Sequence, residues 1–242
     1  MATVTQATPA TPDGLVSDAR VVLIGNPNTG KTTLFNRLCG VRAKTSNFPG
    51  TTTSLRMGRT ALPGDRVVNV IDLPGVYELG LDVPETRIVR DVLQGTGVYR
   101  RPDAVLVVVD ACNLTRNLVL TGELLAHGLP VVVALNMVDL AQARGLTIDA
   151  RKLASRLGCR VVPVVARRGD GLHDVRTALA AALDEVGSAL RARPSPDALP
   201  ARPSTIPEPG ASIETLTNWA DDVMAFSAGL PSAIHVRDPF TE

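Results

Sequence analysis

The chain alternates between short apolar runs and longer stretches in which apolar residues recur with a helical period. The runs "RVVLIG" and "AVLVVVDA" are almost wholly apolar, which is typical of strands buried on both faces of a sheet. The stretch "SLRMGRTALPGDRVVNVID" indicates two strands, because Pro63 and Gly64 mark a turn at Leu62–Asp65. The pattern predicts six strands: 20–25, one on each side of that turn, 104–109, 130–136 and 160–165.

Apolar residues spaced three or four apart predict amphipathic helices between these runs. One helix begins at Pro84 with Glu85 in its first turn, and Ser212 is a candidate N-cap for the last helix. The expected helices are 30–39, the one that begins at Pro84, 114–127, 149–157, 171–190 and 212–228. Strands that alternate with helices favour an α/β fold, with a mostly parallel six-stranded sheet and helices on both faces.

Composition divides the chain into four parts. Residues 1–18 are rich in Thr, Ala and Pro and are expected to form a disordered tail, whereas residues 19–190 carry the α/β pattern of one domain. Residues 191–211 are rich in proline, which excludes a helix or a central strand and indicates an extended linker. Residues 212–242 are expected to form a short helical extension.

Charge and cysteine content narrow the function classes. The formal net charge is +1, so no strong field would recruit nucleic acid or a membrane surface. The three cysteines are far apart and lack metal-ligand spacing, which indicates small buried hydrophobes in a reducing compartment. Neither a signal-peptide pattern nor an apolar run of the ~18 residues that span a bilayer is visible. We therefore expect this stretch to be soluble and intracellular, without a nucleic-acid partner.

The stretch "GNPNTGKTT" directly follows the first predicted strand and opens the first predicted helix. It matches the phosphate-binding pattern G-x-x-x-x-G-K-[ST] in full and in its expected strand-to-helix context. Backbone N–H groups would surround the phosphates, Lys31 would lie along the β- and γ-phosphates, and the Thr32 hydroxyl would bind Mg²⁺. The alternative is a glycine-containing corner with an exposed lysine. The expected phosphate-binding residues are Gly25, Asn26, Pro27, Asn28, Thr29, Gly30, Lys31, Thr32 and Thr33.

The stretch "NMVD" closes the strand 130–136 at the edge where α/β sheets bind ligands. Asp139 would accept two hydrogen bonds from guanine, whereas adenine would leave the carboxylate facing a ring acceptor. Asn136 would brace the loop and reach the purine's other edge, with Met137 beside it. The stretch "VVARRGDGL" follows the last strand, and its Val165, Ala166 and Arg167 are expected near the base, with the Ala166 N–H donating to the guanine oxygen.

Two further stretches predict a metal site and a switch. "DLPG" ends a strand, so Asp72 would hold Mg²⁺ through water and the Gly75 N–H would contact the γ-phosphate. The alternative for this tetrapeptide is an ordinary type II turn. The stretch "NFPGTTTS" supplies three threonines for a mobile Mg²⁺-binding loop. Its Pro49 and Gly50 fit a loop that can change between ordered and disordered states.

Taken together, these residues resemble a translation-factor-type GTPase domain, and within that class the N-terminal cytosolic domain of the bacterial ferrous iron transport protein B. The resemblance covers roughly residues 20–185, and "DACNLTRNL" and "NFPGTT" are more specific to that family than the general GTPase motifs. It implies a Ras-like fold, GTP hydrolysis to GDP, and a polytopic membrane region after Glu242 at the cytoplasmic face of the bacterial inner membrane. It also implies that Thr52 is the Mg²⁺-binding switch threonine and that Asn28 is a K⁺ ligand.

The resemblance also bears on catalysis. Val76 follows "DLPG" where Ras-type enzymes carry a water-orienting glutamine, so slow intrinsic turnover is expected. A K⁺ ion held by Asn28 would supply charge near the phosphates; the alternative is that Asn28 only stabilises the loop. The expected catalytic residues are Asn28, Lys31, Thr52 and Gly75.

The chain departs from the family in two places. Val165 stands where the family usually has serine, which would weaken guanine affinity, and the family's helical subdomain is reduced to the predicted helix 212–228. The functions left open are a GTPase that couples nucleotide state to iron uptake, a GTP/GDP-sensing switch that gates the permease, and a ribosome- or tRNA-associated GTPase. Small accessory transport proteins and a homo-oligomer are possible partners.

Overall fold

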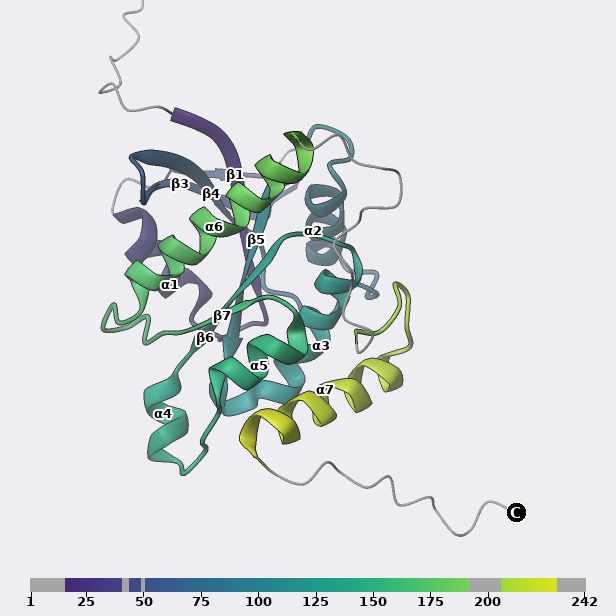
Figure 1. Cartoon of the computed structure of the whole chain (residues 1–242). Helices are drawn as coiled ribbons and strands as arrows, with labels where there is room; N and C mark the ends of the chain where they lie inside the picture. The colour runs from purple at the N-terminus through teal and green to yellow at the C-terminus, as the bar shows by residue number, and fades with distance from the viewer. Residues whose placement is uncertain (1–15, 41–43, 49–50, 192–205, 230–242) are drawn as a thin grey trace, which may run out of the picture.

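The computed structural model describes residues 16–40, 44–48, 51–191 and 206–229. A seven-stranded sheet in the order β2-β3-β4-β1-β5-β6-β7 forms its centre (Figure 1). The strands are β1 Val16–Gly25, β2 Lys44–Asn47, β3 Ser54–Leu62, β4 Arg66–Asp72, β5 Ala104–Asp110, β6 Val131–Asn136 and β7 Arg160–Pro163. The helices are α1 Lys31–Cys39, α2 Pro84–Gln94, the short 3-10 helix Ala111–Asn113, α3 Leu114–Ala126, α4 Val138–Ala143, α5 Ala150–Leu157, α6 Leu172–Arg191 and α7 Ile213–Ala228.

The sheet is mostly parallel, as predicted, but it has seven strands where we expected six. β1 lies between β4 and β5, and both pairs are parallel, as are β5–β6 and β6–β7. β3 pairs antiparallel with β4 and with the additional edge strand β2. The sequence "KTSN" of β2 is wholly exposed, so it lacks the alternation of apolar and polar residues by which strands are recognised. β1 also begins at Val16, earlier than the expected start at residue 20.

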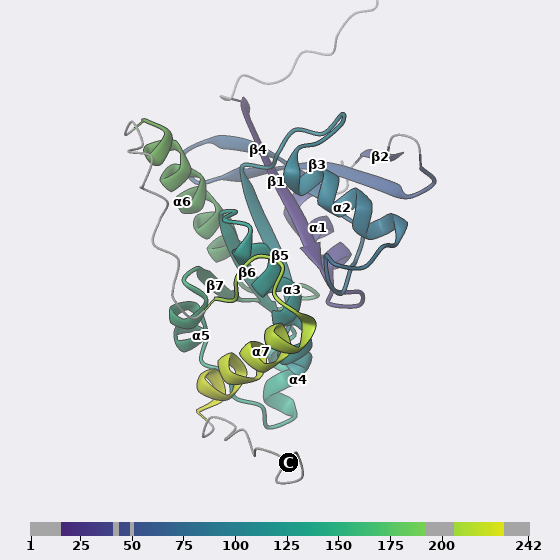
Figure 2. The ribbon, with the colours of Figure 1, turned by 90° about the vertical axis from the view of Figure 1, so that its right-hand side faces the viewer.

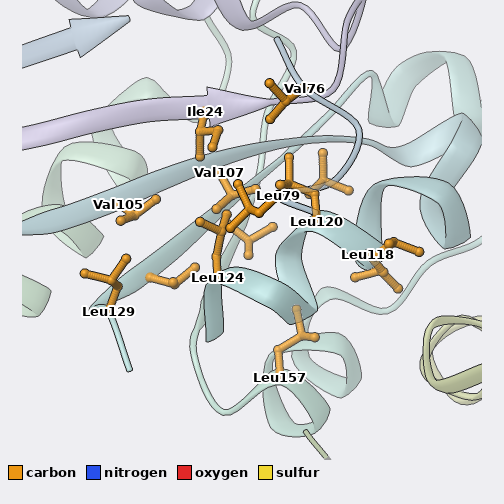
Figure 3. Packing of buried hydrophobic residues seen from close by; sticks show 14 of the residues in the cluster. Ile24, Val76, Leu79, Val105, Val107, Leu118, Leu120, Leu124, Leu129 and Leu157 are labelled. Atoms are coloured by element: carbon orange, nitrogen blue, oxygen red, sulfur yellow. The ribbon is translucent and has the colours of Figure 1, made fainter. Parts of the chain in front are cut away.

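Alternate residues of the strands feed two hydrophobic cores on opposite faces of the sheet. In β1, Val21 and Leu23 contribute to one core, whereas Val22 and Ile24 contribute to the other, as the two-residue period of a strand requires. The first core is covered by α1 and α6, and the second by α2, α3 and α5 (Figures 1 and 2). Figure 3 shows side chains of β1, β5 and α3 together in the second core. Helices therefore cover both faces, as predicted.

α7 forms a further layer outside α3 and α5 (Figure 2). Its Leu216, Trp219 and Val223 are buried in the core that α3 also lines. α3 makes room with Gly122, because a Cβ built there would stand 2.7 Å from the Trp219 ring. Ser212 caps α7 as predicted: its hydroxyl accepts a 3.1 Å hydrogen bond from the Thr215 N–H. The helical extension therefore shares its core with the α/β domain.

Several sequence predictions fall on residues that lie wholly or partly outside the described ranges. They concern most of the tail 1–18 and of the linker 191–211, the end of the extension 212–242, and the loop residues Pro49 and Gly50. The domain boundaries stay predictions. Within the described ranges, no helix is long and apolar enough to cross a membrane. The three cysteines are free and half-buried, and burial raises the thiol pKa of Cys39 and Cys159 to about 12.

Candidate nucleotide-binding site

The predicted phosphate loop connects the carboxyl end of β1 to the first turn of α1. Asn28 and Gly30 adopt left-handed backbone conformations, with φ angles of 66° and 84°. A Cβ on Gly30 would stand 2.3 Å from the Asn136 side-chain nitrogen, and a Cβ on Gly25 would stand 2.5 Å from the Val108 carbonyl oxygen. Both glycines are therefore required by close approach between backbone and neighbouring strands, as the motif predicts.

The N-terminus of α1 keeps its backbone donors directed out of the helix. Gly30 is the N-cap and offers no side-chain hydrogen bond, so the first N–H groups of α1 lack an intrahelical acceptor. Thr32 and Thr33 lie exposed in this first turn, whereas Asn26 and Thr29 of the loop are buried. This arrangement is a ready anion site, because the amides and the helix dipole both favour negative charge there.

Lys31 and Asp72 form an ion pair between the start of α1 and the end of β4. The Lys31 ammonium donates a hydrogen bond to the Asp72 Oδ1, and the side chains are only 12% and 6% exposed. The structure thus brings together the predicted phosphate-binding lysine and the predicted magnesium-binding carboxylate, which lie 41 residues apart. Because both side chains are nearly buried, the attraction between their charges is stronger than it would be in water.

Gly75 of the "DLPG" stretch lies against the phosphate loop. A Cβ built on Gly75 would be 3.2 Å from the Pro27 nitrogen, and the Val76 N–H donates to the Gly25 carbonyl at 3.3 Å. The Val76 side chain is 4% exposed and points into the core with Leu79 (Figure 3). The predicted switch segment therefore begins in contact with the phosphate loop.

Asn136 joins the phosphate loop to the loop that follows β7. Its side-chain nitrogen donates to the Thr29 carbonyl at 2.8 Å, and its Oδ1 accepts from the Ala166 N–H at 3.0 Å. The bracing that the sequence predicted for Asn136 is present, and the side chain is 3% exposed. The Ala166 N–H, which we expect to face a guanine oxygen, donates to Asn136, so the two buried groups satisfy each other.

Asp139 lies in the first turn of α4, a short helix that the sequence did not predict. Its carboxylate is 3.8 Å from the Arg167 guanidinium and 3.6 Å from that of Arg168, and its side chain is 20% exposed. Met137, just before it, takes a left-handed conformation with φ 63°. α4 escaped prediction because its six residues span fewer than two turns. The predicted Val165 is buried behind this loop and pairs with Asp170.

The predicted switch threonine is exposed. Phe48 is buried and anchors the start of this loop, where the Thr51 hydroxyl donates to the Phe48 carbonyl at 3.0 Å. Thr52 lies further along, and its hydroxyl makes no hydrogen bond with another described residue. The structure therefore pairs Lys31 with Asp72, whereas the Thr52 hydroxyl is exposed two residues before β3 begins.

The "DACNLTRN" stretch forms a hydrogen-bonded turn between β5 and α3. Asp110 accepts from the Cys112 N–H at 2.8 Å and from the Asn113 side chain at 2.6 Å. Asn117 donates to the Asn113 carbonyl at 2.7 Å, and its Oδ1 accepts from the Asp110 N–H at 3.3 Å. These polar side chains fix the start of α3 next to the phosphate loop.

Two α3 side chains that the sequence did not single out contact the segment after Gly75. The Arg116 guanidinium carbon lies 4.1 Å from the centre of the Tyr77 ring. Glu123 accepts a 2.7 Å hydrogen bond from the Leu79 N–H. Burial raises the pKa of Glu123 to about 7; the bond from Leu79 opposes that rise, and the negative charge of Glu78 adds to it. In the sequence, the only signal for Arg116 and Glu123 is a spacing that places them two turns apart on one helix face. That spacing indicates a contact only once the segment facing the helix is known.

Comparison with known proteins adds the family. A sequence profile of ferrous iron transport protein B matches residues 19–179. The Fe(2+) transporter FeoB of Legionella pneumophila (strain Paris) is 41% identical over 158 residues, which is 65% of this chain and 21% of that protein. FeoB of Salmonella typhimurium (strain LT2) is 43% identical over 157 residues, or 65% of this chain and 20% of that protein. The chain thus spans about a fifth of the length of these relatives.

Solved structures give the same result for the fold. The cytosolic domain of L. pneumophila FeoB matches with a TM-score of 0.63 and 40% identity, over 68% of each chain. A mutant N-terminal FeoB domain of S. thermophilus bound to mGDP matches with a TM-score of 0.62 and 39% identity, over 67% of this chain and 60% of that one. These matches confirm the Ras-like phosphate-loop fold that the sequence predicted. This chain belongs to the ferrous iron transport protein B family, and residues 19–179 correspond to the family's N-terminal G domain.

Proposed function

We propose that this chain binds GTP and GDP and hydrolyses GTP, as the nucleotide-dependent domain of a ferrous iron transporter. The observation that carries the proposal is the bridge made by Asn136, which holds the phosphate loop and the 164–168 loop together beside Asp139. Support also comes from a relative of 39% identity that is described as bound to mGDP.

The triphosphate would lie over the N-terminus of α1. The free N–H groups of the first turn, together with Lys31, would bind the β- and γ-phosphate oxygens. Lys31 would turn from Asp72 toward the phosphates, which carry more negative charge than one carboxylate. Loop residues 25–30 would approach the phosphates through backbone alone, because Gly25 and Gly30 have no side chain to obstruct them.

Guanine would be selected by Asp139. Its carboxylate would accept from the ring N–H and the exocyclic amine, and adenine would leave it opposite a ring acceptor, a mismatch that discriminates by ~10⁴. Arg167 and Arg168 pair with the carboxylate but are more than half exposed, so they are easily displaced. The Ala166 N–H would share its bond between Asn136 and the guanine oxygen. Val165 is buried and has no hydroxyl to donate in this loop, so guanine affinity would be weaker.

The donor set near Lys31 fits Mg²⁺. Asp72, the Thr32 hydroxyl and, once its loop closes, the Thr52 hydroxyl supply only oxygen atoms, which is the ligand type that Mg²⁺ prefers. Held by these oxygen atoms, the ion would supply positive charge that offsets negative charge developing on the phosphates. Among the described residues no cluster of three His, Cys, Asp or Glu could hold a metal, so iron would not be bound by such a cluster in this part of the chain.

Asn28 would hold K⁺ beside the phosphates. It is exposed, stands in a left-handed conformation, and its amide makes no hydrogen bond with the described residues, so a role in stabilising the loop finds no partner there. Val76 is buried and has no polar atom, so it cannot orient the attacking water. Charge from the cation and the Gly75 N–H would therefore assist transfer of the γ-phosphoryl group to water, which leaves GDP and phosphate.

The nucleotide state would be coupled to iron uptake through a membrane region that follows Glu242, with this domain at the cytoplasmic face of the bacterial inner membrane. The relatives, named as Fe(2+) transporters, are about five times longer than the matched region. The alternative is a switch in which nucleotide occupancy gates the permease and hydrolysis acts only as a timer. This switch would use the same site. Membership of the FeoB family disfavours a ribosome- or tRNA-associated GTPase. Small accessory transport proteins and self-association are further proposals.

The proposal is tested by GTP turnover of the chain in KCl and in NaCl buffers containing Mg²⁺. We expect faster turnover in KCl, loss of that difference in Asn28→Ala, and loss of both nucleotide binding and turnover in Lys31→Ala. Glu214→Gln on the exposed face of α7 is the matched control and should leave turnover unchanged. Equal rates in the two salts would refute the K⁺ role, and no turnover in either would refute the GTPase.

A further inference from the structure

The segment between β4 and α2 has no regular structure of its own. Residues 73–83 contain neither helix nor strand, yet Val76 and Leu79 are 4% and 5% exposed. Figure 3 shows both side chains among core residues of β1, β5 and α3. A segment without hydrogen-bonded secondary structure depends on contacts with its neighbours for a fixed position.

α3 supplies two such contacts from one side. Arg116 stacks on the Tyr77 ring at 4.1 Å, and Glu123 accepts the Leu79 N–H at 2.7 Å. The two side chains are seven residues apart on α3, so they lie two turns apart on the same face of the helix. The stacking and the hydrogen bond therefore hold the segment at two points, both beyond Gly75.

We propose that Glu123, assisted by Arg116, is a positioning residue that holds segment 73–83 against α3 and so sets the place of the Gly75 N–H at the phosphates. The inference rests on the proposed function, because Gly75 would contact the γ-phosphate of GTP. Glu123 does not reach the nucleotide: it acts through Leu79, four residues after Gly75. Because Gly75 contacts Pro27 of the phosphate loop, a shift of the segment would move its amide relative to the phosphates.

Burial of Glu123 beneath the segment is more favourable when its carboxyl is neutral. Burial beneath the segment raises its pKa to about 7, and this outweighs the opposing bond from Leu79. When the segment leaves, the carboxyl meets water and its pKa falls, so ionisation favours departure. Contact with the segment is therefore firm below about pH 4.5, the ordinary pKa of the carboxyl, and weakens as pH rises from there to about 7. Glu78 faces the carboxyl from the segment. A cavity of about 210 Å³ next to Leu79 is lined by Leu79, Arg90, Leu93, Gln94, Arg101, His127 and Leu129.

The first test measures amide hydrogen exchange of Leu79 by NMR, without nucleotide. At pH 4.5 we expect Glu123→Ala to exchange about tenfold faster than wild type, and Glu123→Gln, which keeps a neutral acceptor, to stay close to wild type. At pH 8 wild type should exchange faster than Glu123→Gln, because only wild type ionises. Unchanged exchange in Glu123→Ala, or Glu123→Gln that resembles Glu123→Ala at pH 4.5, would overturn the inference.

The second test measures GTP hydrolysis by the same variants. Glu123→Ala should lower kcat on the order of fivefold with KM changed less than about twofold, and Glu123→Gln should restore kcat. Tyr77→Leu should have a smaller effect of the same kind, and Tyr77→Phe, which keeps the ring, should not. Unchanged kcat in Glu123→Ala overturns the catalytic part of the inference. Absence of hydrolysis by wild type overturns the proposed function instead, while the exchange experiment still decides whether Glu123 holds the segment.

If Glu123→Ala fails to fold, the comparison of wild type with Glu123→Gln between pH 6 and pH 8 decides alone. If the Leu79 exchange rate of wild type divided by that of Glu123→Gln rises with pH, the inference is supported. If that ratio stays constant, the inference is overturned. Glu214→Gln, which changes an exposed carboxylate of α7, is the matched control and should follow wild type at every pH.

Discussion

Asn136 and Asp139 are three residues apart but have different tasks at the candidate site. Asn136 is 3% exposed, and its amide is used by Thr29 and Ala166, so its visible role is to hold two loops together. Asp139 is 20% exposed, and its salt bridges go to exposed arginines, so its carboxylate remains accessible to a ligand. Replacement of Asn136 would leave two buried backbone groups unpaired, whereas replacement of Asp139 changes the chemistry offered to a base.

Asp139→Asn is expected to weaken the preference for guanine without unfolding the chain. The amide loses one of the two acceptor atoms that guanine needs and gains a donor that suits the C2 oxygen of xanthine. We expect the affinity for GTP to fall by a factor of ~100 or more and the affinity for XTP to rise. The measurement is competitive binding of GTP and XTP. An unchanged ratio of the two affinities would show that Asp139 does not recognise the base.

Residues of the phosphate loop could be predicted from the sequence because their roles follow from the backbone. Gly25 and Gly30 stand where a Cβ would meet neighbouring atoms within 2.5 Å, and that need is visible as a fixed spacing. The hydrogen bond from the Ala166 N–H to Asn136 was not predicted, because the sequence does not tell which nearby acceptors a backbone donor meets. Glu123 escaped prediction, since its partner is a backbone N–H that carries no sequence signal.

At the scale of elements, α3 connects the candidate site to α7. One side of α3 contacts the segment after Gly75, and Gly122 on another side contacts Trp219 of α7. The strands and long helices were predictable because each carries a hydrophobic period. β2 and α4 were not, since β2 is wholly exposed and α4 is six residues long. The position of α7 could not be predicted from the sequence either, because the role of Gly122 depends on the Trp219 ring that lies against it.

Gly122→Val is expected to displace α7 from α3. Any Cβ at this position meets the Trp219 ring at 2.7 Å, and the added methyl groups find no room, which costs about 1–3 kcal/mol of unfolding free energy. Trp219 is the only tryptophan, so its fluorescence reports on this contact directly. We expect a red-shifted emission and a lower Tm. Asn218→Val at an exposed position of α7 is a control, and native emission from Gly122→Val would contradict the packing described here.

The stability of the chain is expected to depend on Glu123 in a defined pH window. Its folded pKa is about 7, above the value of 4.5 that applies in the unfolded chain, so the folded state binds more protons between these values. The contribution of Glu123 to stability is therefore present below pH 4.5 and is lost as pH rises to 7. Glu123→Gln cannot ionise, so its Tm relative to wild type should increase from pH 5 to pH 8. A constant difference in Tm would contradict the raised pKa.

In the whole molecule, the seven-stranded sheet places the predicted nucleotide-binding stretches at the carboxyl edge of its parallel strands, and the loop of Thr52 leads into β3 where β3 pairs with the carboxyl end of β4. The phosphate loop follows β1, "DLPG" follows β4, "NMVD" follows β6, and the 164–168 loop follows β7. Adjacent parallel strands bring their ends together, so stretches 140 residues apart in sequence form one site. The family resemblance accounts for residues 19–179, and α7 is packed onto that unit rather than apart from it.

The central claim is that this edge binds a guanine nucleotide. Isothermal titration calorimetry of the chain with GDP and with ADP, both in Mg²⁺ and KCl, tests it most directly. We expect GDP to release or absorb heat with a one-to-one stoichiometry and a defined affinity, and ADP to give no heat. Lys31→Ala should lose the GDP signal. No heat from GDP, or equal affinities for GDP and ADP, would contradict it.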